Sequence, residues 1–458
     1  MSPPDAAPTG LLGAVSPAYG LVRRRLAAST AGGLLPAAVV SAETADPVPT
    51  LQVALSPGAG GAGIRYQSAA TSATGEAIER YSAAYVPYDQ LLFGTRADVD
   101  APITPSAEWA LYASASQTGT AHPWTPGDHA DGFVNLTDEA RLGWVRAQRL
   151  HDGRSSAVPA QWVYLGYGRG RGEPLLVWTT STGLACADDL PTAVLRGLLE
   201  VIERDAFLRT WRRRLTLPRV RIDGLLERHR WLADGLARPD GFRLSVVDLT
   251  GLAPAPTMLA TLRHPHPEMP ALAVGAASAL TRGAAATKAV IEVCHTSLYA
   301  AGLRLAERCQ ISDAGGTPSG LTGRGTDADN FDQHVWQYVD QERVAATQFL
   351  DAGPITLDVD WAEARSADPS ADPSADPHGD AQRLARRWQR DGVETFAVDV
   401  TSPDVADLGL AVARVISPQA AQLDVAEPYL GQPRLLRPTG VGDDVDVVAL
   451  NPDPHPFP

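Results

Sequence analysis

The sequence has almost no lysine. Lys288 is the single lysine among 458 residues, so essentially every other cationic side chain is an arginine. A P-loop of the form G-x-x-x-x-G-K-[ST] needs a lysine between glycine and serine or threonine, and Lys288 stands in Ala-Ala-Thr-Lys-Ala-Val. A lysine Schiff base could form only here, and a kinase-type strand lysine is not indicated either. If the protein handles a nucleotide, it does so without the usual lysine.

Cysteines and long apolar runs are also scarce. Cys186, Cys294 and Cys309 are widely spaced, which indicates neither a disulfide framework nor a zinc site and suits a reducing compartment. No uncharged apolar run reaches the roughly 18 residues of a spanning helix. The arginines at 23–25 follow the mildly apolar N-terminal stretch, the reverse of a signal peptide. We expect a cytoplasmic protein that does not enter a membrane.

The charge is negative overall. The chain has 39 Lys and Arg against 53 Asp and Glu, which gives a formal net charge of −14 and a pI near 5.2. Nucleic-acid binding takes much of its affinity from cationic contacts to phosphates, and anionic membrane surfaces attract basic segments. The balance argues against both kinds of partner.

The pattern of apolar residues predicts an α+β fold, that is, a mixed α/β chain. At about 150 residues per domain the length would allow three domains, but no linker divides the chain before residue 366. Helices are predicted at 66–86, 189–211, 284–308, 328–350 and 380–391, and strands at Leu175–Thr180, Arg243–Leu249, Glu394–Val400, Leu410–Ile416 and Val445–Leu450.

One large domain, residues 15–458, is the predicted organisation. Residues 1–14 are rich in proline, alanine and glycine, and we expect them to be disordered. A low-complexity loop is expected at 366–380, where Ser-Ala-Asp-Pro occurs three times in tandem. Alternating prolines make residues 451–458 an extended tail. That tail is a stiff exposed strand, a ligand for an SH3-type groove, or a segment that threads back into a site.

Two separate segments repeat Glu-Xaa-Ile-Glu-Arg on helices that are otherwise apolar. Like-charged carboxylates near a core repel each other and need an arginine or a cation for compensation. One such segment is more often a solvated helix face with intrahelical ion pairs. Because the segment occurs twice, the alternative is that the two glutamate pairs face each other and supply oxygen ligands to Mg²⁺. The polar residues on the two helix faces are Ser72, Glu76 and Glu79, then Glu200, Glu203 and Arg204.

Three further features have two interpretations each. Thr179–Gly183, at the end of a predicted strand and ahead of a helix, is an anion-binding junction or an ordinary turn. Cys186 has no histidine nearby in sequence, which favours a small buried residue over a nucleophile. Glu292 and His295, three residues apart on a helix, ligate a metal or form a hydrogen-bonded core pair. With the two acidic segments, this pair leaves open a dinuclear carboxylate metalloenzyme, although di-iron bundles use two E-x-x-H segments.

Taken in order, these pieces resemble the YcaO family, the ATP-dependent enzymes that activate the peptide backbone in ribosomal peptide modification. Ser72–Ala83 resembles the family's SAxGEAxERYSA helix, and Ser181–Phe207 resembles its STGLAxG…LLEvxERDAF segment. The terminal prolines resemble the P-x-P-x-P signature of members that form azolines. Further matches are Val15–Val22, Glu394–Gly409 and Leu430–Leu435.

The resemblance implies a single large YcaO-type domain with a nucleotide site unlike the P-loop, and ATP and Mg²⁺ as cofactors. The positions that match the family's metal ligands are Glu76, Glu79, Glu200 and Glu203. Ser72 and Arg204 match positions that contact the nucleotide. The terminal carboxylate, at Pro458, would lie near the active site and act there together with Arg204.

The reaction implied is cyclodehydration. A Cys, Ser or Thr side chain of a precursor peptide attacks the preceding amide carbon, ATP phosphorylates the oxyanion, and phosphate leaves to give a thiazoline or oxazoline. Partners implied are that precursor peptide, a leader-peptide-binding ThiF-type protein and a flavin dehydrogenase acting downstream, as in thiopeptide and other antibiotic biosynthesis. Thioamide or amidine formation, and a non-catalytic scaffold, are the alternatives.

The chain departs from the family pattern at a few positions. The usual Gly-Lys-Gly ahead of the first helix reads Gly61-Ala62-Gly63 here, so the lysine contact is missing or supplied by Arg65. Ala187 stands where the family has glycine, and Ser417–Ala420 replaces its vPGL segment. These departures concern the adenosine side of the site more than the metal.

Overall fold

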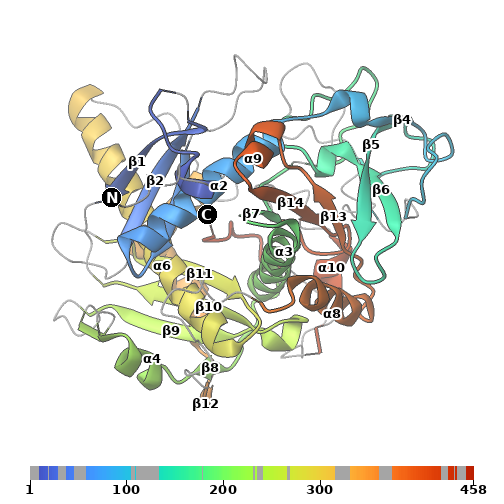
Figure 1. Ribbon diagram of the computed structural model, residues 1–458. Helices are drawn as coiled ribbons and strands as arrows, with labels where there is room; N and C mark the ends of the chain where they lie inside the picture. The colour runs from blue at the N-terminus through green and yellow to red at the C-terminus, as the bar shows by residue number, and fades with distance from the viewer. Residues whose placement is uncertain are drawn as a thin grey trace.

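Three long helices connect three β-sheets in the computed structural model (Figure 1). The structure describes residues 10–18, 20–28, 38–45, 58–104, 109, 134–177, 179–230, 233–234, 241–265, 269–314, 331–359, 374–423, 432–437, 439–440 and 450–457, with the backbone alone at 12, 28, 306–314 and 357.

The sheets differ in size and are antiparallel except for one strand pair. The first has the order β1 (Val22–Ala28), β2 (Ala38–Thr44), β3 (Gly58–Gly63). The second runs β11 (Leu272–Ser278), β10 (Thr257–Arg263), β9 (Arg243–Asp248), β8 (Arg219–Val220) and β12 (Ile355–Leu357), with β12 parallel to β8. The third runs β4 (Leu92–Gly94), β5 (Leu142–Arg149), β13 (Phe396–Asp399), β14 (Ala411–Ile416) and β7 (Leu184–Ala187), and β6 (Ser155–Pro159) pairs with β5.

The helices fall into long and short groups. The long ones are α2 (Tyr66–Ala84), α3 (Leu190–Arg212) and α6 (Arg282–Ala314). Shorter α-helices are α4 (Asp223–Arg228), α7 (Phe331–Trp336), α8 (Pro377–Gln389), α9 (Pro403–Asp407) and α10 (Pro433–Leu436), and 3₁₀ turns are η1 (Gly10–Leu12), η2 (Tyr88–Gln90), η4 (Ala160–Trp162), η5 (Thr250–Leu252) and η6 (Gln341–Asp351). Within the described ranges no helix is long and apolar enough to cross a membrane.

Local sequence explains where α3 begins and ends. The side chain of Asp189 accepts a hydrogen bond from the backbone N–H of Thr192 at 2.8 Å, and a proline occupies the first turn. Arg209 and Arg212 lie in the last turn, where cations are favoured by the helix dipole. The helix therefore has a fixed start, and this start sets which faces its glutamates occupy.

Glycines let α2 and α6 approach their sheets closely. A Cβ on Gly61 of β3 would lie 2.2 Å from the backbone nitrogen of Ala73 in α2. A Cβ on Gly275 of β11 would lie 2.2 Å from the nitrogen of Val293 in α6. Only glycine fits at either position, and the close packing brings the polar faces of both helices near the strands.

Each long helix packs against two sheets (Figure 1). Helix α2 contacts β2 and β3 of the first sheet and β7 of the third. Helix α3 contacts β14 and β7 on one side and β10 and β11 on the other, and α6 covers β10 and β11 and reaches β3. The three helices therefore meet at the centre of the described structure.

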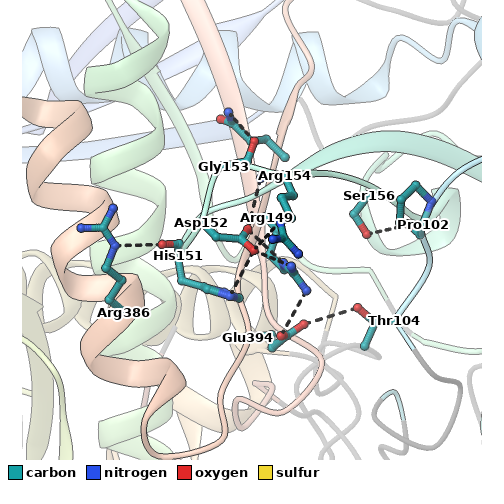
Figure 2. A network of polar contacts seen from close by, with 11 residues as sticks. Pro102, Thr104, Arg149, His151, Asp152, Gly153, Arg154, Ser156, Arg386 and Glu394 are labelled. Atoms are coloured by element: carbon teal, nitrogen blue, oxygen red, sulfur yellow. Dashed lines mark hydrogen bonds and ion pairs between the residues drawn. The ribbon is translucent and has the colours of Figure 1, made fainter.

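A polar network fastens the turn after β5 to the rest of the third sheet (Figure 2). The guanidinium of Arg149 pairs with Asp152 and lies 3.7 Å from the carboxylate of Glu394 beside β13. On α8, Arg386 donates a hydrogen bond at 2.9 Å to the backbone oxygen of His151. These contacts hold the β5–β6 hairpin against α8 and β13, two elements that lie far from the hairpin in the sequence.

The α+β class is confirmed, and several boundaries predicted from the sequence are wrong. The helix predicted at 328–350 is two pieces, α7 and η6. Leu175–Thr180 is not a strand among its described residues, because the strand is β7, after the turn. Part of the segment expected to be disordered is ordered: η1 lies within it, and Ala14 is buried. Helix α8 begins inside the predicted loop 366–380. The strand predicted up to Leu450 lies outside the described residues, apart from Leu450 itself, which is not in a strand.

Candidate functional site

Glu76 joins α2 to the first sheet. The backbone N–H of Gly60 in β3 donates a hydrogen bond to Oε2 of Glu76 at 2.8 Å. The other oxygen pairs with Arg80, one turn further along α2, which also donates to the backbone oxygen of Gly58. The carboxylate is thus oriented by both the strand and the helix, and it remains partly exposed.

Glu79 points instead toward the third sheet. The backbone N–H of Cys186 in β7 donates to its Oε1 at 2.8 Å. Burial, and next the negative charge of Glu200 on α3, raise the pKa of Glu79 to about 8, and Glu76 adds to the effect. These surroundings therefore favour the neutral, protonated form of Glu79, and a nearby cation would favour the charged form.

On α3, Glu200 and Arg204 form an ion pair one helical turn apart. Nη2 of Arg204 lies 2.8 Å from Oε1 of Glu200, and Nη1 donates to the hydroxyl of Thr182 at 2.6 Å. Nε of Arg204 is buried and has no hydrogen-bond partner in the part of the chain that the structure describes. The arginine thus keeps one donor available for a further acceptor.

Glu203 is buried between α3 and the second sheet, with 7% of its surface exposed. The backbone N–H of Ser278, at the end of β11, donates to its Oε2 at 3.2 Å. Burial raises the pKa of Glu203 to about 7, even though Lys288 of α6 acts in the opposite direction. A cation near Glu203 would favour its charged form.

Helix α6 adds Glu292 and His295, which the sequence analysis grouped with the two acidic segments only in the alternative of a dinuclear carboxylate site. The carboxylate of Glu292 lies 3.7 Å from Nδ1 of His295. Burial alone would raise the pKa of Glu292, but His295, Lys288 and Arg204 together lower it. The spacing on α6 predicted the Glu292–His295 pair, but nothing in the sequence indicated which neighbours it would face.

His295 also lies against β3. A Cβ on Gly60 would come within 2.8 Å of Nε2 of His295, so the ring occupies space that only glycine leaves open. Burial disfavours the charged imidazole, but the carboxylates of Glu292 and Glu76 outweigh it and raise the pKa of His295. The Glu292–His295 pair is therefore part of the central cluster of charges.

The charged groups of the three helices form one electrostatic cluster. Glu79 on α2 interacts with Glu200 on α3, Glu203 on α3 interacts with Glu292 on α6, and His295 on α6 interacts with Glu76 on α2. Within the described ranges, no group of three or more His, Cys, Asp or Glu side chains is arranged so that it could hold a metal ion by itself. A cation held by such carboxylates would complete its shell with water and phosphate oxygens, as Mg²⁺ prefers.

Three other predicted features have different surroundings. Ser72 is exposed, one turn of α2 before Glu76. The Thr179–Gly183 segment is a turn that precedes β7, so the predicted junction from strand directly into helix is wrong. Burial, and next the charge of Glu79, raise the pKa of the Cys186 thiol to about 12, which agrees with a small buried residue rather than a nucleophile.

The proline-rich tail threads into the structure along α3. Arg212 donates to the backbone oxygen of Asn451 at 2.8 Å, and Trp211 donates to that of Asp453 at 2.9 Å. Further on, the ring of Phe457 packs against Phe207 with centroids 4.8 Å apart. Most of residues 451–457 are thus buried, although Pro452 is exposed, and the alternatives of an exposed strand or an SH3 ligand are wrong for this segment.

The tail runs toward the charged cluster. Its contacts on α3 move from Arg212 to Phe207, one turn from Arg204, as the chain proceeds from Asn451 to Phe457. Pro458 lies outside the described residues. Its predicted place near the active site therefore stays a prediction, which the direction of the tail supports.

Comparison with known proteins decides the family. The family model of the YcaO cyclodehydratases, which are described as ATP- and Mg²⁺-binding, matches residues 60–421 of the sequence. The chain belongs to the YcaO family. A curated but uncharacterized protein of Methanothermobacter thermautotrophicus is 29% identical over 208 residues, which cover 42% of this chain and 44% of that protein.

Solved structures share the YcaO fold. A heterocyclase in complex with substrate and cofactor has a TM-score of 0.69 at 20% identity, over 98% of this chain and 56% of that one. YcaO from Methanopyrus kandleri, bound with AMPPCP and Mg²⁺, has a TM-score of 0.55 at 18% identity, over 87% and 86%. The E. coli microcin synthetase McbBCD complex with pro-MccB17 bound has a TM-score of 0.58 at 14% identity, over 95% and 96%. The chain spans about half the length of the first relatives it matches.

The residues of the central cluster fit the family's cofactors, ATP and Mg²⁺. Burial is the main cause of the raised pKa values of Glu79 and Glu203, and a divalent cation beside them would favour their charged forms. The free Nε of Arg204 is a donor suited to phosphate oxygens. The four predicted glutamates and Arg204 are the groups that would hold the two cofactors.

Proposed function

We propose that this YcaO protein is an ATP-dependent cyclodehydratase that converts Cys, Ser or Thr residues of a ribosomal precursor peptide into thiazoline or oxazoline. The observation that carries the proposal is the convergence of Glu76 and Glu79 from α2 with Glu200 and Glu203 from α3. These helices are far apart in the sequence, and a solvated helix face would not bring such carboxylates together inside the fold.

The chemistry balances as the removal of one water for each ATP. The side-chain sulfur or oxygen loses its proton as it bonds to the preceding amide carbon, the former carbonyl oxygen leaves as part of inorganic phosphate, and the amide proton is lost as the C=N bond forms. ATP, when bound with Mg²⁺, supplies the phosphoryl group that turns that oxygen into a leaving group. No protein nucleophile is needed, in agreement with the high pKa of Cys186.

The chain's own residues position the reacting groups and neutralise their charge. The glutamates give the site the oxygen donors that suit Mg²⁺. Arg204, anchored by Glu200 and Thr182, presents Nε as a donor for developing negative charge. Holding these groups in place before the reaction is the larger part of catalysis in phosphoryl transfer.

The tail supports the azoline-forming branch of the family over thioamide or amidine formation. Residues 451–457 are held along α3 and lead toward Arg204. We propose that Pro458, which follows these described residues in the sequence, helps to order the site. Its role together with Arg204 is part of the proposal.

We also propose the partners that such a reaction needs. The McbBCD complex is a microcin synthetase with pro-MccB17 bound, an assembly of subunits and a peptide. By analogy, this chain would act on a precursor peptide presented by a leader-binding ThiF-type protein in the cytoplasm. A flavin dehydrogenase would oxidise the azolines downstream.

Mass spectrometry of a candidate precursor peptide tests the proposal. The peptide is incubated with ATP, Mg²⁺, this protein and the ThiF-type protein encoded nearby. We expect the loss of one water at each modified residue, localised by fragmentation to Cys, Ser or Thr. Replacement of oxygen by sulfur would indicate a thioamide, and a crosslink to an amine would indicate an amidine. No ATP consumption with all components present would favour the scaffold alternative.

A further inference from the structure

Arg414 occupies a position in β14 where the strand pattern calls for an apolar residue. Side chains two apart on a strand share a face, and the neighbours of Arg414 on its face are Val412 and Ile416. Both belong to the apolar core that includes Trp162 and the inner face of α2. Arg414 is only 4% exposed. A buried cation at such a position is costly unless it is paired or has a ligand.

The described residues satisfy only part of this guanidinium. Nε of Arg414 donates to the backbone oxygen of Trp162 at 3.2 Å. Nη1 is buried and has no hydrogen-bond partner in the part of the chain that the structure describes. No carboxylate forms an ion pair with it there, and its strongest favourable charge interaction is with Glu200, which is already paired to Arg204. Burial lowers the pKa of Arg414 to about 9, which agrees with the contacts above: the described neighbours compensate this cation only in part.

A second incompletely satisfied guanidinium lies close by. Arg204 and Arg414 are near enough to repel each other, and each has one buried donor without a described partner. Both adjoin the turn before β7: Arg204 donates to Thr182, and Arg414 is opposite Leu184 in the β14–β7 register. Two neighbouring arginines, of which only Arg204 has an ion pair with Glu200 and each of which has a free buried donor, suit an anion with several oxygens.

We propose that Arg414 binds a phosphate oxyanion, either the phosphoryl group that is transferred or the inorganic phosphate that is released, together with Arg204. The inference rests on the proposed function and deepens it by assigning a residue to that anion. Phosphate suits the place because its oxygens can accept from both guanidiniums while others face a cation held by the neighbouring glutamates. Neither the acidic segments nor the resemblance indicated Arg414.

The test measures phosphate binding rather than turnover. Thermal unfolding of the full chain is followed against inorganic phosphate, with Mg²⁺ and ADP present, because a ligand that binds the folded state raises the midpoint. We expect phosphate to stabilise the wild type. We expect Arg414→Lys to weaken apparent phosphate affinity by about tenfold or more, since lysine keeps the charge but loses the fork of donors. Arg414→Met should remove the effect, while the affinity for ADP changes by less than about threefold.

Arg434→Lys is the matched control, because this buried arginine is fully paired with Asp205 at 2.8 and 2.9 Å and lies outside the cluster. It should lower the unfolding midpoint without changing the phosphate response. Phosphate affinity equal to wild type in folded Arg414→Lys protein would overturn the assignment and make Arg414 structural. A wild type that binds Mg²⁺ and AMPPCP but no phosphate would overturn it as well and leave the proposed function standing. A wild type that binds no nucleotide would overturn both.

Discussion

Glu203 illustrates how a buried carboxylate can indicate a place that suits a cation. It is buried, accepts a hydrogen bond from Ser278, and has a pKa raised to about 7 chiefly by burial. Such a group is stable as a neutral acid in the isolated protein and becomes a strong ligand only when a cation compensates its charge. The same logic applies to Glu79, whose pKa is about 8.

The first prediction concerns Glu203→Gln. Glutamine is nearly the same size and can still accept from Ser278, so the variant should fold with a wild-type unfolding midpoint. The charge that would hold Mg²⁺ is gone, and peptide-dependent ATP hydrolysis should fall by about a hundredfold or more. Hydrolysis is measured with partner and peptide supplied.

The control for this variant is Glu173→Gln. Glu173 pairs with the hydroxyl of Tyr167 outside the cluster, so the same substitution there should leave hydrolysis unchanged. Wild-type turnover by Glu203→Gln would remove Glu203 from the metal site, whatever the other glutamates do.

At the scale of elements, the tail and α3 act as one unit. The tail is held by backbone contacts from Arg212, Trp211 and Tyr338 and by the ring of Phe457. These contacts fix the end of the chain without using any residue of the charged cluster. Loss of the tail should therefore affect the ordering of the site more than the binding of nucleotide.

The second prediction is that deletion of Pro454–Pro458 lowers cyclisation by about tenfold or more while the KM for ATP changes by less than about threefold. Phe457→Ala is the companion variant, because it keeps the chain end and removes only packing against Phe207. It should cost about 3 kcal/mol of stability and retain most of the cyclisation. Equal cyclisation by the deleted and full-length proteins would make the tail purely structural.

What the sequence predicted at this scale was what local spacing encodes. Helices α2 and α3 follow from their apolar faces, and the positions of their glutamates follow from the helical repeat. Strands β3 and β11 were missed because Gly-Ala-Gly-Gly-Ala-Gly and Leu-Ala-Val-Gly-Ala-Ala-Ser have little strand propensity. Their glycines are required by helices that pack from elsewhere in the chain, which no local pattern shows.

For the candidate site too, the sequence predicted the residues that belong to a local motif and missed those that do not. The two glutamate pairs were found because their motif repeats, and Glu79 of the first pair does lie near enough to Glu200 of the second for their charges to interact, while their role in metal binding stays a prediction. Arg414 was missed because a lone arginine in a strand has no motif. The role of Lys288 was missed because it depends on a charge interaction with Glu203, which lies on another helix. The surroundings of both residues are set by tertiary contacts between distant segments, and such contacts cannot be predicted from the local pattern of a single sequence.

The whole molecule should respond to pH through these buried acids. Glu79 and Glu203 have an ordinary pKa of 4.5 and values of about 8 and about 7 in the folded protein. At pH values between 4.5 and these raised pKa values, the folded protein keeps protons on Glu79 and Glu203 that the unfolded chain has released. Stability of the metal-free protein should therefore fall as pH rises from about 4.5 to about 8 and level off above.

The third prediction adds Mg²⁺ and AMPPCP to that experiment. A bound cation replaces the protons on both carboxylates, so this part of the pH dependence of the unfolding free energy should disappear. Urea unfolding is measured from pH 5 to pH 9, with and without the two ligands.

Glu79→Gln should reduce the slope of the metal-free protein, because the group with the largest shift is gone. Glu139→Gln, at an exposed position, should leave the slope unchanged. An identical slope in wild type and Glu79→Gln would mean that the acids do not keep their protons in the folded state. Their charges would then already be compensated without a metal, and the reason for placing Mg²⁺ beside them would be lost.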